Sequence, residues 1–202
     1  MRHVEFAAYV FVVTMVSISL SFGDDKPTKS ATPLTADEIA VYKAVLAHYS
    51  SKEAGVLNVS IRTFPLNPES PRNGLSKGGC LQGMELENLT SASRTFHELT
   101  PEVLSGKNMK LVDAKKQAQV VRSNDPDKTM REGKSVENAV ASAFATGLFS
   151  MSEIAFDKER RHAVVSYSFW CGSLCGNGST LVFEKIGQEW RRTDRNCGGW
   201  IS

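Results

Sequence analysis

Two cysteines separated by three residues, Cys171 and Cys175, constrain the fold of this chain more than any other feature of its sequence. From Ala163 to Phe169, just before the pair, apolar residues alternate with polar or small ones, which is the pattern of a β-strand with one buried face. A second strand is expected from Leu181 to Ile186, after a glycine-rich stretch at 171–178. The sequence therefore predicts an antiparallel hairpin with the cysteine pair in its connecting loop.

The chain opens with the features of a secretory leader. A basic start at Arg2 is followed by an apolar run from Phe6 to Phe22 and by small residues at its end. We expect cleavage between Gly23 and Asp24, which makes 1–23 a signal peptide and the mature protein secreted or periplasmic. The alternative is an uncleaved membrane anchor, because the run is at the short limit of what spans a bilayer.

The remainder of the chain is balanced in charge and has the length of one domain. The polar segment 24–34 is expected to be a flexible linker, and 35–202 a single α+β domain. The net charge of +2 argues against nucleic acid as a partner, which would require a strongly basic patch. No segment after the leader is apolar enough to cross a membrane, so we expect no membrane contact after cleavage.

Four cysteines remain after the leader, and in an oxidising compartment an even number predicts two disulfides with three possible connectivities. We favour pairing of Cys171 with Cys175 and of Cys80 with Cys197, and the other two connectivities stay open. A redox-active pair would have a shorter spacing at a helix N-terminus, and a four-cysteine zinc site would need reduced thiols. A structural staple is therefore the preferred interpretation, with no metal and no cofactor.

Helical patterns flank the central part of the chain. Thr35 and Glu38 form a capping box at the start of an amphipathic helix that continues to about Ser50. A second amphipathic helix is expected after the cap residue Ser135, with an apolar face of Val136, Ala139, Val140, Ala143, Phe144 and Leu148.

Strand and loop patterns fill the rest. The alternation at 57–61 predicts a half-buried strand, and short strands are expected at 110–112 and 119–121. Repeated proline and glycine residues at 65–79 indicate a long surface loop. Gly187 and Gln188 indicate a two-residue hairpin turn. Together these elements predict an α+β fold, in which helices pack on an antiparallel sheet with a C-terminal four-strand meander.

Several stretches resemble a family of uncharacterised secreted bacterial proteins with a C-terminal CGxLCGxG hairpin. They are Val41 to Leu46, Ser152 to Phe156, Val164 to Ser168, Cys171 to Gly178, and Cys197 to Trp200. The resemblance implies export, and it supplies no catalytic residue because we know of no assigned activity for the family.

Familiar catalytic and metal motifs are incomplete in this sequence. His97 and Glu98 begin like the zinc-protease helix, but Pro101 stands where the second histidine ligand is required. A hydrolase whose catalytic residues are dispersed in the sequence, involving His97, Glu98 or His162, remains an alternative. Thiol exchange through Cys171 and Cys175 is a second alternative.

The preferred interpretation is a noncatalytic binding or interaction domain of unknown ligand. Its partner would be a protein or an envelope ligand, and its contact surface the cysteine loop with the neighbouring aromatic residues. The candidate binding residues are Trp170, Ser173, Leu174, Asn177 and Trp200.

Overall fold

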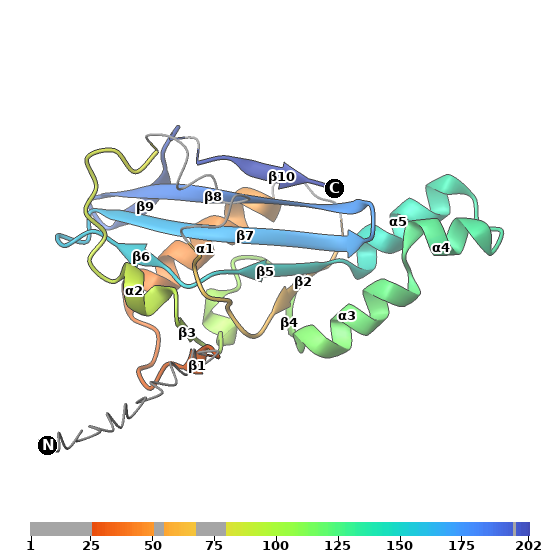
Figure 1. Cartoon of the computed structure of the whole chain (residues 1–202), viewed down its shortest axis with the longest axis horizontal. Helices are drawn as coiled ribbons and strands as arrows, with labels where there is room; N and C mark the ends of the chain where they lie inside the picture. Colours follow the sequence, from red (N-terminus) through yellow and green to blue (C-terminus); the bar gives the residue numbers. More distant parts are fainter. Residues whose placement is uncertain (1–25, 51–54, 68–79, 196) are drawn as a thin grey trace, which may run out of the picture.

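The computed structural model describes residues 26–50, 55–67, 80–195 and 197–202 (Figure 1). The expected signal peptide and most of the expected loop at 65–79 lie outside these residues. None of the helices in the described part is long and apolar enough to cross a membrane.

Helices and strands both contribute to the fold, which is therefore α+β. The helices are α1 (Ala36–Ser50), α2 (Leu89–Ala92), α3 (Ala114–Ser123), α4 (Pro126–Arg131) and α5 (Val136–Thr146), with a 3-10 turn at Pro101–Val103. The strands are β1 (Thr28–Lys29), β2 (Leu57–Ser60), β3 (Thr95–Phe96), β4 (Met109–Val112), β5 (Leu148–Met151), β6 (Ala155–Phe156), β7 (His162–Gly172), β8 (Cys175–Ile186), β9 (Glu189–Arg192) and β10 (Gly199–Ile201).

The main sheet is mixed, which corrects the expectation of an antiparallel one. Its strand order is β10-β8-β7-β5-β2-β4, and β2 runs parallel to both β4 and β5. Strands β6, β7, β8 and β9 pair antiparallel in chain order, but β7 also pairs with β5 and β8 also pairs with β10, so they are part of the mixed sheet and the expected C-terminal four-strand meander is not confirmed as a separate unit. Pairing of β2 with strands much later in the chain has no local sequence signal, which is why the parallel part was missed.

The long hairpin of β7 and β8 is the centre of the molecule. Helix α1 packs on one face of the sheet, where the apolar side chains of β5, β7 and β8 contact Tyr42, Leu46 and Tyr49 (Figure 1). A smaller apolar cluster on the other face surrounds the disulfide between Cys80 and Cys197. Helices α3, α4 and α5 gather at the end of the sheet, beside the tip of this hairpin (Figure 1).

Both predicted helix starts are confirmed. At the start of α1, the Thr35 N–H donates to Glu38 Oε2 at 2.6 Å and the Glu38 N–H donates to Thr35 Oγ1 at 3.3 Å. At α5 the Ser135 hydroxyl accepts from the N–H of Asn138. The structure also pairs Cys80 with Cys197 and Cys171 with Cys175, the favoured connectivity.

Two other local expectations, about residues 119–121 and about β2, were wrong. Residues 119–121 belong to α3 and are not a strand, because Asp113 caps a helix that continues through them. Every residue of β2 is buried, although a half-buried strand was expected, since β2 lies between β4 and β5. Within the expected linker, Thr28–Lys29 form β1, which pairs with β3.

Candidate functional site

The tip of the β7–β8 hairpin is fixed to the start of α4. Asp125 caps α4, with Oδ1 accepting from the N–H of Asp127 at 3.0 Å. Its other oxygen, Oδ2, accepts from the N–H of Ser173 in the hairpin tip at 2.6 Å. Gly172 makes this approach possible, since it has a φ of +149° and a Cβ there would lie 2.6 Å from Pro126.

The pKa of Asp125 reports the same contact. Partial burial raises the pKa of the carboxyl group, but the donors at Ser173, Lys128 and Asp127 outweigh it and hold the pKa below its ordinary value. The carboxylate is therefore charged at neutral pH and joins two elements that are distant in sequence.

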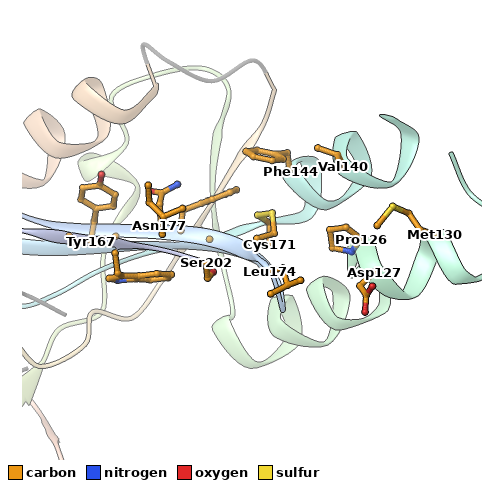
Figure 2. A pocket seen from close by; sticks show the side chains of 17 residues that line it. Pro126, Asp127, Met130, Val140, Phe144, Tyr167, Cys171, Leu174, Asn177 and Ser202 are labelled. Carbon is orange, nitrogen blue, oxygen red and sulfur yellow. A yellow bond between two sulfur atoms is a disulfide. The ribbon is translucent and has the colours of Figure 1, made fainter. Parts of the chain in front are cut away.

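A large hollow of about 1010 Å³ lies beside this junction. Figure 2 shows its walls, with Val140 and Phe144 from α5, Pro126 and Met130 from α4, and the hairpin tip with its disulfide. The remaining lining residues are Asp127, Tyr167, Phe169, Leu174, Gly176, Asn177, Gly178, Gly199, Trp200, Ile201 and Ser202. We call this space the larger hollow; its volume is that of pockets that bind small molecules.

A second hollow of about 400 Å³, the smaller hollow, shares two lining residues with the first. It is lined by Gly55, Val56, Leu57, Gly106, Lys107, Asn108, Met109 and Ala145, together with Phe144 and Phe169. The rings of Phe144 and Phe169 have centroids 5.7 Å apart and line both hollows. The two hollows therefore share an aromatic wall.

Exposed apolar side chains concentrate at these hollows. Nine large apolar residues are exposed in the described part of the chain, and five of them line one or both hollows. These five are Val56, Val140, Phe144, Leu174 and Ile201. Such a concentration on a protein surface is characteristic of a binding site.

Of the five predicted binding residues, three line the larger hollow and two do not. Leu174, Asn177 and Trp200 line the larger hollow, and Leu174 is 79% exposed. Ser173 contributes its backbone N–H to Asp125 and does not line the hollow. Trp170 is partly buried between Leu148 and Gly176 and lies outside the lining.

The indole of Trp200 packs against the glycines of β8. A Cβ on Gly178 would come within 2.3 Å of Trp200 Nε1, and one on Gly176 within 3.2 Å of the same indole ring. Because Gly178 pairs with Trp200 across β8 and β10, the absence of side chains leaves the space that the indole fills. The glycine-rich motif thus makes room for Trp200, which forms part of the edge of the larger hollow.

Sequence reasoning missed the contribution of α4 and α5. Val136, Val140 and Phe144 were expected to face the core, yet they are 65%, 40% and 41% exposed, while Ala139 and Ala143 are buried. The signal was present as large residues at i, i+4 and i+8 beside a face of alanines. The helix has a buried face of alanines and an exposed face of larger apolar residues, and the sequence pattern alone did not separate the two.

Two histidines form pairs with carboxylate side chains. His97 Nδ1 lies 2.7 Å from Glu153 Oε2, both side chains are buried, and Glu153 also accepts from the hydroxyl of Thr63. Glu98, which follows His97 in the sequence, is exposed and forms an ion pair with Lys29. Neither His97 nor Glu153 lines the larger or the smaller hollow, so this buried pair lies away from the candidate site.

His162 forms the second pair. Its Nδ1 lies 2.8 Å from Asp157 Oδ2, and Asp157 Oδ1 accepts from the backbone N–H groups of Arg161 and His162. Burial raises the pKa of Asp157, but these donors outweigh it and hold the pKa below its ordinary value. The pair lines a third hollow of about 440 Å³, next to Glu85 and Glu159.

Within the described residues, no group of three or more histidine, cysteine, aspartate or glutamate side chains is arranged to hold a metal ion. Comparison of the chain with models of known families, with curated proteins and with solved structures found no match. The resemblance to secreted bacterial proteins therefore stays a prediction.

Proposed function

We propose that this protein is an exported, noncatalytic binding domain that takes an apolar ligand at the hairpin tip. The observation that carries the proposal is the concentration of exposed apolar side chains around the two hollows. Export is supported by the leader pattern and by two disulfides, which persist in oxidising compartments.

The rigidity of the site supports this proposal. Three separate contacts hold the walls: the Cys171–Cys175 disulfide, the Asp125 bond to Ser173, and the packing of Phe169 over Gly147. A preformed apolar hollow binds without the entropic cost of ordering its walls. The free energy of binding then comes mainly from burial of the apolar surface of the ligand.

Binding of an uncharged fluorescent probe, N-phenyl-naphthylamine, tests the proposal. Saturable binding to the wild-type protein is expected to fall by about tenfold or more in Phe144→Asp, because a charge replaces an aromatic wall of both hollows. Ile186→Asp is the matched control, since Ile186 is 51% exposed at the other end of the β7–β8 hairpin and lines neither hollow. Equal binding by the two variants would contradict the proposal.

A hydrolase is a second candidate, supported by the His162 pair alone. With Nδ1 held by Asp157, the Nε2 atom of His162 is available to accept a proton from a water molecule in the third hollow. His162→Gln should then abolish hydrolysis of an aryl ester that the wild type cleaves, and Glu98→Gln should not. Absence of cleavage by the wild type across ester and peptide substrates would count against this candidate.

Thiol exchange has less support, because Cys171 is only 1% exposed and Cys175 is only partly exposed, and an attacking thiolate must reach one of these two sulfurs. It stays a prediction.

A further inference from the structure

The shared wall of the two hollows favours a long ligand over a compact one. Phe144 and Phe169 contribute to both spaces, so a ligand that fills either hollow contacts the same two rings. A flexible chain that passes these rings would bury apolar surface in both hollows at once. Met109 and Met130, one in each hollow, have unbranched side chains that adapt to such a ligand.

The charges at the two hollows differ. Asp127 is the charged residue that lines the larger hollow, and its carboxylate is already paired with the guanidinium group of Arg131. Lys107 is the charged residue that lines the smaller hollow, and it makes no ion pair with any residue that the structure describes. An ammonium group at the end of an apolar hollow attracts an anion.

From these observations we infer that the two hollows connect past Phe144 and Phe169 and together hold a long unbranched alkyl chain with its anionic head group at Lys107. The chain extends past Phe144 and Phe169 towards Leu174 and the hairpin tip. This inference deepens the proposed function and rests on it, and it commits to a free long-chain carboxylate as the ligand.

The affinities of dodecanoate and dodecanol, measured by displacement of the naphthylamine probe, separate the contribution of the head group to binding from that of the alkyl chain. The wild type should bind dodecanoate more tightly than dodecanol, and hexadecanoate more tightly than octanoate, by roughly fourfold for each methylene group until the hollows are filled. Lys107→Glu should weaken binding of dodecanoate by about fivefold or more and leave dodecanol unchanged.

Lys110→Glu is the matched control for the head group. Lys110 is exposed on the neighbouring strand β4, three positions further along the chain, and lines neither hollow. It makes the same change in net charge, so any general electrostatic effect would be equal in the two variants. Only an effect specific to Lys107 supports the inference.

Two results would overturn the inference, and they differ in what they leave standing. If Lys107→Glu and Lys110→Glu bind dodecanoate equally well, the placement of the head group is wrong, while probe binding that depends on Phe144 keeps the proposed function. If the probe and both alkyl ligands fail to bind, and light scattering shows a dimer that Phe144→Asp dissociates, a second copy of the chain covers the apolar surface. Both proposals then fail.

Discussion

Asp125 and Ser173 are 48 positions apart in the chain, yet the carboxylate of one accepts the backbone N–H of the other at 2.6 Å. This bond joins α4 to the tip of the β7–β8 hairpin, the two elements that form one end of the larger hollow. The position of the hairpin tip is thus set by a side chain that also caps a helix.

Asp125→Asn is expected to break this junction without removing the cap. The amide oxygen of asparagine still caps α4, but its NH₂ group stands where Oδ2 accepted and would face the N–H of Ser173. Loss of a hydrogen bond to a charged acceptor should lower the free energy of unfolding by about 1 to 3 kcal/mol in urea titrations.

Asp113→Asn is the control for this prediction. Asp113 caps α3 by accepting from the N–H of Lys116, is exposed, and has no bond to another element. Its variant should keep wild-type stability within about 0.5 kcal/mol. A loss of equal size in both variants would mean that Asp125 acts as a cap alone.

The stability of the protein should fall in acid because of Asp125 and Asp157. Each carboxyl group has a pKa below the ordinary value of 3.8, since N–H donors outweigh the effect of burial. A lowered pKa in the folded state adds stability that is fully present above the ordinary pKa and is lost as the pH falls through the lower folded value. Urea titrations across this acidic range should therefore show a shallower decline for Asp157→Asn than for the wild type. Parallel declines would show that Asp157 is not part of the acid response.

Gly178→Ala is expected to displace the indole of Trp200. The new Cβ would lie 2.3 Å from Trp200 Nε1 and 2.7 Å from the backbone oxygen of Tyr167, and the latter is fixed in the sheet. Overpacking of this kind costs about 1 to 3 kcal/mol. We expect lower stability and a changed tryptophan emission spectrum, whereas Gly106→Ala, where the nearest atom is 3.7 Å away, should behave as the wild type. An unchanged spectrum for Gly178→Ala would show that β10 does not hold Trp200 against β8.

The two disulfides should differ in their effect on stability. The Cys80–Cys197 bond links residues 117 positions apart, whereas Cys171 and Cys175 are 4 positions apart. By the loop-closure argument the first stabilises the folded state by about 5 kcal/mol and the second by about 2 kcal/mol. Replacement of each pair by serine, followed by thermal unfolding, should lower the melting temperature more for the first pair. The reverse order would mean that the short bridge has a role in packing beyond chain entropy.

Local features of the fold were predictable, and long-range ones were not. The capping box of Thr35 and Glu38 and the cap at Ser135 are patterns within four residues, and both are confirmed. The parallel pairing of β2 joins segments far apart in the chain and leaves no local pattern. The disulfides lie between these cases, because the cysteine count limited the connectivities to three and the structure contains the favoured one.

The same distinction applies to the candidate site. Leu174, Asn177 and Trp200 were predicted as binding residues because they lie in or near the motif at 171–178, and all three line the larger hollow. Phe144 was assigned to the apolar face of its helix and not to a site, and Lys107 was missed because nothing in its own neighbourhood marks it. They become part of a site only when α5 and the start of β4 are brought to the hairpin, so only a three-dimensional structure identifies them.

The position of β2 between β4 and β5 also bears on the order in which the molecule folds. Leu57 of β2 pairs with Met109, and Asn58 pairs with Leu148, whereas β7 and β8 join through a tight turn. Long-range pairing is slow because a large loop must close before any contact forms, so we expect the β7–β8 hairpin to form early and β2 to dock late. Leu57 and Met109 both line the smaller hollow, so a folding intermediate that lacks β2 would expose the apolar wall of Phe144 and Phe169 to other chains and be prone to aggregate.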